Sequence, residues 1–471
     1  MSSGTRLATD SDDSITEAAP QGAEPHERWH RRLWPRWVGR MPMAADTRRV
    51  GSANWAWIIM AIVAAAGFLL RQRGAPGTDD VMWAEDGSEF LQAELTRPSF
   101  SNLLHPYAGY ASLLPRIVAA VVAEMPLPMW ATAMAVASVA IRIGAAVVAY
   151  HTTKAYITNN RLRLALPVVF VTLPVGGLET LNNICNVHWF MIPAAALIML
   201  WRPKSWVASV AGALWIMVTV MSDPLAILLG PLVLWRLLTL RSWKEHVPAV
   251  GFVLGSAVQG LVVLGAPPRT GGTAGLGEAF EAFGLRVLTG WLFGLELSLT
   301  LVIMMGLAGA IAVGVIITTI VIMPAIRTPG PRRQLSFAMF GESALFFIVM
   351  ALFTVSGVLT PEGNLPVLAA LARYSVLGIL LLAPAILAGL DAWVGSRKRA
   401  LIGEVGLAVV ASIYIVGVAQ AYGSDLTSSS APPWRDVPAI VEDACKGGVP
   451  EAVVPIAPDT WAIRIPCGTV E

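Results

Sequence analysis

The feature that most constrains this chain is a series of long apolar runs that carry very few charged residues. Each run approaches the roughly 20 residues that an α-helix needs to cross a bilayer. Backbone polar groups in hydrocarbon must be satisfied within the segment, so such runs form helices rather than open strands. A hydrophobic fraction of 55% with only 14% charged residues lies outside the range of soluble domains. We therefore predict an all-α, polytopic membrane protein.

Eleven runs qualify as membrane spans. They are residues 53–70, 128–150, 164–180, 187–201, 205–221, 224–239, 247–265, 296–323, 336–358, 374–394 and 400–422. The segment from Tyr107 to Met125 is not counted as a span, because it carries Arg116 and Glu124 and is bounded by prolines. We interpret it as a juxtamembrane helix.

The placement of Lys and Arg orients these spans, because basic residues in short loops favour the cytoplasmic side. With a cytoplasmic N-terminus, every inside loop is basic. These loops hold Lys154, Arg161 and Arg163; Arg202 and Lys204; Arg236, Arg241 and Lys244; Arg327, Arg332 and Arg333; and Arg397, Lys398 and Arg399. A twelfth span at Tyr107 to Met125 would move all of them outside, so the charge pattern favours eleven.

This topology predicts three parts. Residues 1–50 form a cytoplasmic, partly disordered basic tail, residues 51–422 form the transmembrane domain, and residues 423–471 form an extracytoplasmic segment. The outside loop 71–129 carries juxtamembrane helices. Cys445 and Cys467 are the two cysteines of the final segment, and in an oxidising compartment we expect them to pair, with two free thiols as the alternative. Cys185 is interpreted as a small buried residue.

Polar residues at membrane depth are costly, which makes them functional candidates. The first group follows the first span, where four carboxylates lie within eight residues: Asp79, Asp80, Glu85 and Asp86. Carboxylates there can act as a base or hold a divalent cation, whereas helix capping and solvated loop charge would need no function. The spacing of Phe90, Leu91 and Leu95 predicts a helix lying on the membrane after them.

Three further groups are predicted on the same outer face. The second holds His105, Tyr107, Tyr110 and Arg116; the third holds Glu179, Asn182, Asn183, Asn186, His188 and Trp189; the fourth holds Arg373 and Tyr374. Asn amides can hydrogen-bond sugar hydroxyls, an indole can stack on a sugar, and a guanidinium suits a phosphate. Interfacial anchoring of the tyrosines and snorkelling of Arg373 are the alternatives without function. Asp223 and Arg286 are weaker candidates of the same kind.

This arrangement resembles the GT-C superfamily of integral membrane glycosyltransferases, which carry an acidic motif in the first outside loop followed by an interfacial helix. Here Glu85 and Asp86 match the acidic motif, Phe90 to Leu95 the helix, and His105 to Tyr110 with Arg116 the later segment. The match covers the first 130 residues best. The form WAEDG followed by PYAGY is also similar to a group of uncharacterised actinobacterial multi-span proteins.

The resemblance implies transfer of a sugar from a polyprenyl-phosphate donor to a cell-envelope glycan or glycolipid acceptor at the outer face. Asp86 or Glu85 would be the general base, with Asp80 as a competing carboxylate, and a divalent cation is an open question. The alternatives are a transporter or flippase of a lipid-linked saccharide, and a non-catalytic scaffold. The expected partners are membrane lipids and these substrates; a net charge of +2 gives no reason to expect nucleic acid.

The topology predicts that a cysteine placed at Ser88 reacts with a membrane-impermeant thiol reagent added from outside the cell. The outside loop 71–129 carries this position, so reagent confined to the cytoplasmic side should leave it unlabelled. Labelling of inverted vesicles and intact cells compares the two sides. Reaction from the cytoplasmic side alone would overturn the eleven-span topology.

Overall fold

The computed structural model describes residues 43, 59–61, 63–64, 80–97, 102–175, 180, 182–266, 274–354, 372–395, 400–423 and 431–469. All of these belong to one compact unit, Met43–Glu471. The predicted N-terminal tail, most of the first predicted span, Asp79 and Glu179 lie outside the described residues.

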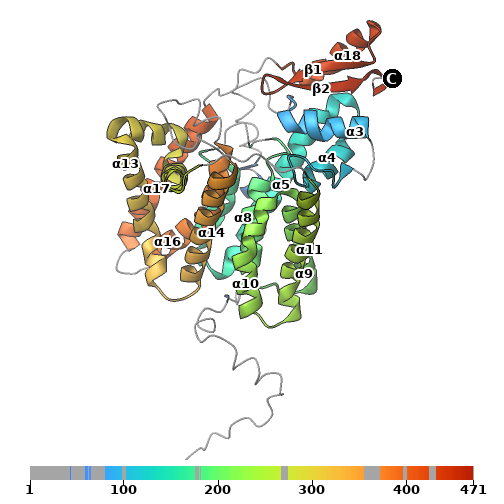
Figure 1. Ribbon diagram of the computed structural model, residues 1–471. Helices are drawn as coiled ribbons and strands as arrows, with labels where there is room; N and C mark the ends of the chain where they lie inside the picture. Colours follow the sequence, from blue (N-terminus) through green and yellow to red (C-terminus); the bar gives the residue numbers. More distant parts are fainter. Residues whose placement is uncertain are drawn as a thin grey trace, which may run out of the picture. The chain divides into compact units, whose positions relative to one another are not determined.

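The described part of the chain is mostly helical (Figure 1). The longer helices are α4 (Leu113–Ala123), α5 (Trp130–Thr152), α6 (Asn160–Val171), α8 (His188–Leu200), α9 (Trp206–Ser222), α10 (Gly230–Thr239), α11 (Trp243–Gly265), α12 (Leu276–Phe283), α13 (Gly290–Arg327), α14 (Pro331–Thr354), α16 (Arg373–Val394), α17 (Ala400–Gly423) and α18 (Val437–Lys446). The shorter helices include η2 (Asp86–Leu91), α3 (Gln92–Thr96), η6 (Pro224–Leu229) and η7 (Gly284–Thr289).

Every predicted span after the first overlaps a helix, although α6 ends at Val171 within the predicted span 164–180. Six helical stretches in the described residues are long and apolar enough to cross a membrane: Leu127–Ala155, Trp243–Gly265, Leu276–Arg327, Pro331–Phe353, Arg373–Val394 and Leu401–Ala421. The runs at 164–180, 187–201, 205–221 and 224–239 form shorter helices. A mostly helical chain with several apolar helices long enough to cross a membrane is therefore confirmed, while the number of eleven spans and their orientation stay predictions.

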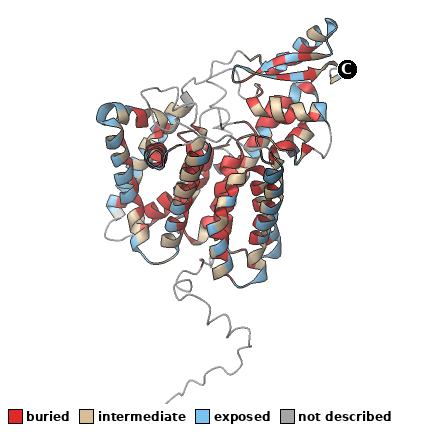
Figure 2. Cartoon of the chain, in the orientation of Figure 1, coloured by how far each residue is buried: buried red, intermediate tan, exposed pale blue. Residues whose placement is uncertain are grey.

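Two helices, α8 and α16, form the centre of the bundle. Every residue of α8 is buried, as are all residues of α16 from Ser375 to Asp391 (Figure 2). The predicted span 296–323 is less regular, because α13 has left-handed backbone at Gly294 (φ 66°) and Gly306 (φ 75°). A side chain at Gly294 would also meet the carbonyl oxygen of Pro174, so glycine suits this break.

Helix α6 ends early because a buried arginine completes its C-terminus. Arg142 of α5 donates from Nε to the carbonyl oxygen of Phe170 and from Nη2 to that of Val171, at 2.9 and 2.8 Å. Its guanidinium also stacks 4.1 Å from the ring centre of Phe190. A cation that binds the last carbonyls of a helix stabilises that end. The chain can therefore leave the helix at Val171 without unsatisfied carbonyl groups there.

The predicted basic loops are joined at one end of the bundle. The contacts are Tyr156 with Leu200, Arg202 with Glu245, and Asp391 with Thr158, Asn159 and Arg332. The Asp391 carboxylate is buried and accepts two backbone N–H groups together with the Arg332 guanidinium. These bonds hold the ends of α6, α14 and α16 together, which agrees with the predicted grouping of these loops on one side.

The C-terminal segment folds against the acidic segment after the first span. Strands β1 (Glu451–Ile456) and β2 (Trp461–Pro466) form an antiparallel hairpin that the all-α prediction did not include. Ala457 pairs with Trp83, and Gln92 exchanges two hydrogen bonds with the backbone of Arg464. Phe90 and Leu91 pack in the same core cluster as the hairpin. The helix predicted to lie on the membrane therefore buries its apolar residues in protein.

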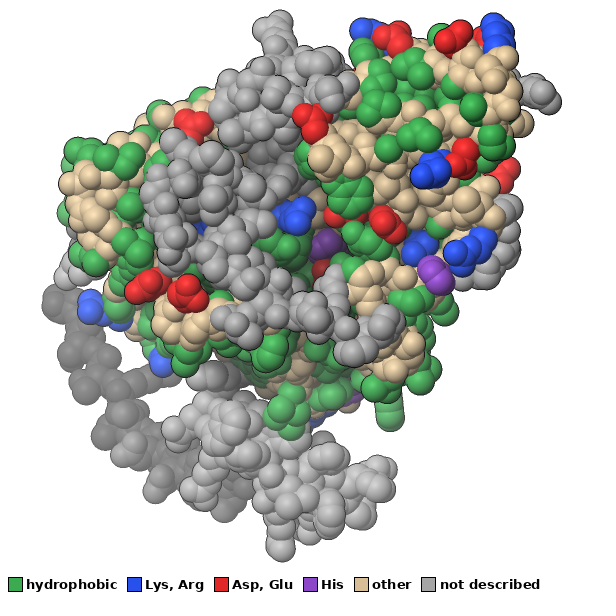
Figure 3. All heavy atoms as spheres, turned by 45° about the horizontal axis from the view of Figure 1, so that its top comes forward, with side chains coloured by type: hydrophobic (Ala, Val, Ile, Leu, Met, Phe, Trp, Pro, Cys, Tyr) green, Lys and Arg blue, Asp and Glu red, His purple; other side chains and the backbone are tan. Residues whose placement is uncertain are grey.

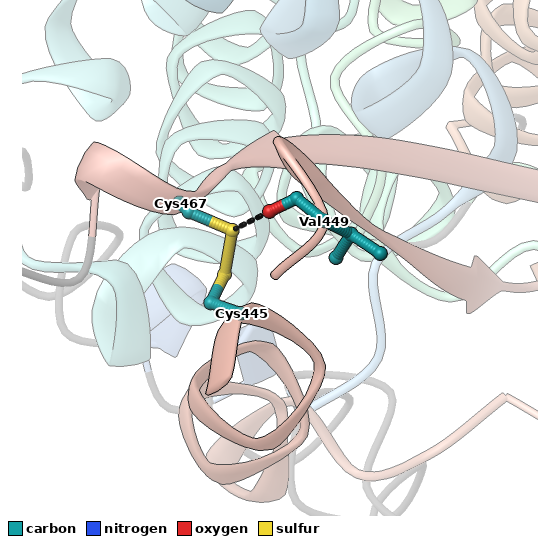
Figure 4. The surroundings of a disulfide bond; sticks show 3 residues. All are labelled: Cys445, Val449 and Cys467. Carbon is teal, nitrogen blue, oxygen red and sulfur yellow. Dashed lines mark hydrogen bonds between the residues drawn. A yellow bond between two sulfur atoms is a disulfide. The ribbon is translucent and has the colours of Figure 1, made fainter. Parts of the chain in front are cut away.

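A disulfide joins Cys445 of α18 to Cys467 after β2, as predicted (Figure 4). The two Cα atoms are 5.7 Å apart, and the carbonyl oxygen of Val449 lies 3.2 Å from the Cys467 sulfur. The bond closes a loop that contains the whole hairpin, so it ties α18 to the strands.

Removal of this bond should loosen the C-terminal segment. A closed loop of this size stabilises by about 3 kcal/mol in the chain-entropy description. We expect the double variant Cys445→Ser, Cys467→Ser to be cleaved faster by protease within residues 431–469 than the wild-type protein, without reductant. Cys185→Ser is the control and should leave the rate unchanged. Equal rates for all three proteins would contradict a stabilising role.

Candidate functional site

The Asp86 carboxylate links the acidic segment to the turn before α8. It is 1% exposed, and its two oxygens accept hydrogen bonds from the backbone N–H groups of Ile184 and Cys185 at 2.7 and 2.8 Å. These partners lie 98 and 99 residues further along the chain. The first and third predicted groups are thus brought together by one carboxylate.

The asparagines of this turn shape it through their side-chain oxygens. The Asn183 oxygen accepts the N–H of Asn186 at 3.1 Å, and the Asn186 oxygen accepts the indole N–H of Trp189 at 2.9 Å. The carbonyl of Asn183 accepts the Ser138 hydroxyl at 2.8 Å. Asn182 adopts left-handed backbone (φ 57°), which Asn tolerates better than most residues. The side-chain oxygens of Asn183 and Asn186 therefore hold the turn in its conformation.

His188 begins α8 and pairs with Asp223. Its Nε2 lies 3.0 Å from the carboxylate of Asp223, and both side chains are nearly completely buried. Asp223 also caps η6 by accepting the N–H of Leu225 at 2.7 Å. Sequence analysis ranked Asp223 among the weaker candidates, yet it is the residue that fixes the predicted His188.

The fourth group contacts the third through aromatic rings. The ring of Tyr374 meets that of Trp189 edge-on at 5.8 Å, and the Arg373 guanidinium lies 5.2 Å from the Tyr374 ring centre. Burial raises the pKa of the Cys185 thiol, the charges of Glu85 and Asp86 raise it further, and Arg373 lowers it. The two carboxylates and the guanidinium are therefore close enough to act on the same turn.

The two neighbouring carboxylates have different surroundings. Burial raises the pKa of Asp86 to about 7, against the lowering effect of its two backbone hydrogen bonds, and the charge of Glu85 adds to the increase. Glu85 is half-buried and forms no hydrogen bond or ion pair with any residue that the structure describes. Acidic, basic and histidine side chains gather near the centre of the face in Figure 3. Glu85 is the carboxylate available to an added molecule.

The second predicted group packs elsewhere, against Phe90. The ring of Tyr107 meets that of Phe90 at 5.6 Å, and the Arg116 guanidinium lies 5.6 Å from the same ring. Tyr107 and Tyr110 exchange backbone hydrogen bonds across a tight turn. His105 is exposed, and its pKa is lowered by partial burial and by Arg116 and Arg97. Groups one, three and four therefore meet at the turn, whereas group two contacts η2 through Phe90.

Asp80 belongs to the contact with the C-terminal segment. Its carboxylate accepts the N–H of Arg435 at 2.9 Å and lies 3.5 Å from the Arg435 side chain. Its backbone carbonyl also accepts the N–H of Trp434. Asp80 therefore joins the acidic segment to the C-terminal segment and does not contribute to the turn before α8. Among the described residues, no three His, Cys, Asp or Glu side chains gather as metal ligands.

Sequence analysis missed Gln259, which holds the juxtamembrane segment. Its amide oxygen accepts the N–H of Ala111 at 3.1 Å and its amide nitrogen donates to the Ala111 carbonyl. The Ser222 hydroxyl accepts the N–H of Leu114 in the same way. A single amide within the apolar run 247–265 was the available signal, since a buried polar group needs a partner.

Comparisons with known proteins give limited similarity. No family model matches the sequence, and no curated protein matches it. Among solved structures, an archaeal oligosaccharyltransferase from Archaeoglobus fulgidus, in complex with an inhibitory peptide and a dolichol-phosphate, matches 78% of this chain and 56% of its own at 12% identity, with a TM-score of 0.38. Two further structures of an oligosaccharyltransferase from the same organism are also similar. One contains Zn and sulfate (TM-score 0.39, 12% identity, 77% and 53% covered), and one is tethered to an acceptor peptide (0.39, 12%, 79% and 55%).

The chain spans about half the length of these solved proteins. We therefore base the functional proposal on the residues of this chain.

The raised pKa of Asp86 has a consequence for stability. Between the ordinary value of 3.8 and about 7, the folded protein binds this proton more tightly than the unfolded chain does. The free energy of unfolding should therefore fall as the pH rises through this range and level off above it. Asp86→Asn removes the titration, so its unfolding temperature in detergent should fall less than that of wild type. Parallel pH profiles of the two proteins would contradict the titration.

Proposed function

We propose that this protein is a membrane glycosyltransferase that takes a sugar from a polyprenyl-phosphate donor and transfers it to a cell-envelope glycan or glycolipid. The observation that carries this proposal is that Glu85, a carboxylate without a bonded partner among the described residues, and Arg373, a guanidinium, both lie near enough to the turn before α8 to act on Cys185. A base and a cation close together are what transfer from a phosphate ester requires.

The depth of the turn favours a lipid-linked donor. Helices α6 and α8, which lead to and from it, have 12 and 13 residues, so they are about 18 and 20 Å long. The hydrocarbon core is about 30 Å thick. With the basic loops at the cytoplasmic boundary, the turn lies inside the outer half of the membrane. A phosphate attached to a prenyl chain can reach such a position from the lipid side.

The reaction follows from these two groups. The acceptor hydroxyl gives its proton to the carboxylate of Glu85 while its oxygen forms the new bond to the anomeric carbon. The bond from that carbon to the phosphate oxygen breaks, and its electron pair leaves with the lipid phosphate. Arg373 stabilises the negative charge that develops on the phosphate, because a guanidinium offers paired donors in a fixed geometry.

Geometry separates the roles of the two acidic residues. Both oxygens of Asp86 already accept backbone N–H groups, so this carboxylate is engaged in holding the turn, whereas Glu85 has no bonded partner among the described residues. We assign Glu85 as the general base and Asp86 as a positioning residue that holds the turn. His188 is fixed by Asp223 and has a positioning role as well. Tyr374, half-buried and packed against Trp189, offers aromatic surface to the sugar.

The donor and acceptor are the partners that this proposal implies, together with the membrane lipids. The basic links between α5 and α6, α8 and α9, α10 and α11, and α13 and α14 are short in the structure. None of these four has room for a nucleotide-binding domain, and this supports a lipid-linked donor.

Glu85→Gln tests the base directly. A positioned base contributes roughly 100-fold or more, so transfer from a radiolabelled prenyl-phosphate sugar in membranes should fall by about that factor. Asp86→Asn should lower transfer less, because it disturbs the turn but leaves the base. Glu124→Gln, an exposed carboxylate at the end of α4, is the matched control and should keep wild-type activity.

The outcomes discriminate between the assignments. A larger loss in Asp86→Asn than in Glu85→Gln would assign the base to Asp86. Full activity in both variants would remove the acidic pair from the chemistry. If wild type transfers from no prenyl-phosphate sugar but moves a labelled lipid-linked saccharide across vesicles, the protein is a transporter instead.

A further inference from the structure

Arg116 is a buried charge whose hydrogen-bonding groups are unused. The side chain of this α4 residue is 2% exposed, and its Nε and Nη1 atoms have no hydrogen-bond partner among the described residues. A guanidinium has five donors, and leaving buried donors unpaired is unfavourable. Arg236 also has one unbonded nitrogen, Nη2, but its other nitrogens and the guanidinium of Arg142 donate to backbone carbonyls.

Acceptors lie near Arg116 but do not bond to it. Glu94 of α3 is 6% exposed, and its Oε1 atom also has no hydrogen-bond partner. Burial raises the pKa of Glu94, while Asn102 and Arg116 lower it. Burial likewise raises the pKa of Glu89, and Arg116 lowers it. The two glutamates are thus close enough to interact electrostatically with Arg116, yet neither forms an ion pair with it.

The walls around these groups are aromatic and partly open. The Phe90 ring lies against the guanidinium, and the ring of Tyr107 meets Phe90 edge-on. Tyr107 and Glu89 are half-buried, and His105 is exposed. Orphaned donors and an orphaned acceptor therefore occur together at a place whose rim reaches the surface.

The charges decide which ligand fits. Glu94 and Glu89 are close enough to interact electrostatically with Arg116, so an added phosphate would meet the unpaired oxygen of Glu94, an acceptor of its own sign. A hydroxyl group both accepts and donates, so it can bond to Arg116 and to Glu94 at the same time. Tyr107 supplies the aromatic surface that a sugar ring requires. Neutral hydroxyl groups satisfy every orphaned atom here, and an anion satisfies only the donors.

We infer that Arg116 and Glu94, with Tyr107 at the rim, form a subsite for a neutral saccharide, the sugar of the acceptor. This inference rests on the proposed glycosyl transfer and deepens it, because it separates the acceptor from the phosphate. Arg373 lies at the turn, on the donor side, whereas Arg116 contacts η2 through Phe90. Asp86 and Phe90, four positions apart in the same short helix, connect the two sites.

Direct binding to the full-length protein in detergent tests the subsite. The probes are methyl glycosides of gluco, galacto, manno and arabino configuration, with methyl phosphate as the anionic comparison. We expect at least one glycoside to raise the unfolding temperature and methyl phosphate to do so much less. Arg116→Met and Glu94→Gln should weaken glycoside binding about tenfold to hundredfold, which is the usual effect of losing a hydrogen bond to a charged group.

Matched controls are available in the C-terminal hairpin. Arg464 and Glu451 form an exposed pair, so Arg464→Met and Glu451→Gln should leave glycoside binding unchanged. Without ligand, the double variant Arg116→Met, Glu94→Leu should raise the unfolding temperature, because it removes two buried charges that form no ion pair with each other. A lower unfolding temperature would show that the two charges are satisfied within the fold and would overturn the inference.

Two further results would also overturn it. Binding of methyl phosphate in preference to every glycoside would make Arg116 an anion site. If no probe changes the unfolding temperature and Glu94→Gln leaves the transfer kinetics unchanged, Arg116 and Glu94 do not bind a saccharide.

Failure of the proposed function is distinguishable from failure of the subsite. Glycoside binding that depends on Arg116, with no transfer from any prenyl-phosphate sugar, would retain the subsite and remove the glycosyltransferase assignment. Transfer that depends on Glu85, with an unchanged KM for the acceptor in Glu94→Gln, would retain the glycosyltransferase assignment and remove the subsite. The expected result is a raised acceptor KM in Glu94→Gln with an unchanged KM for the donor.

Discussion

The bonds from Asp86 to the backbone N–H groups of Ile184 and Cys185 are the interaction on which the site depends. They connect a segment that follows the first span to a turn about one hundred residues later. The acidic segment is also held by the C-terminal hairpin, by Trp434 and Arg435, and by packing against α4. The position of Glu85 beside the turn follows directly, because Glu85 is the residue before Asp86. The carboxylate that holds the turn thus sets the place of the carboxylate that we assign to chemistry.

This interaction is balanced rather than uniformly favourable. Two backbone hydrogen bonds favour the charged carboxylate, but complete burial disfavours it more strongly, and the result is a pKa near 7. A fully paired surface carboxylate would stay charged at every pH of biological interest. The turn before α8 is therefore linked to a proton equilibrium within the neutral range, and Glu85 adds its own charge to that balance.

Sequence alone predicts the helices well and the contacts between them poorly. Apolar runs identify α5, α11 and α16, because a long apolar segment in hydrocarbon satisfies its backbone polar groups only as a helix. The disulfide was also predicted, from cysteine count and compartment. In contrast, the turn 183–188 was interpreted as a set of sugar ligands, and the structure shows that Asn183 and Asn186 use their oxygens locally. A side-chain list cannot tell these uses apart, since both need the same amide chemistry.

The same limit explains the two arginines that sequence analysis treated alike. Arg116 and Arg373 were both assigned to phosphate, because a guanidinium favours anions wherever it lies. The difference between them comes from neighbours distant in the chain or on other helices: Glu89 and Glu94 surround Arg116, whereas Arg373 lies at the turn that Glu85 adjoins. A short helix of six residues, η2, carries contacts to both places. Asp86, at the start of η2, holds the turn, and Phe90, one helical turn later, supports Arg116, so the separation of donor and acceptor would lie along a single helical segment.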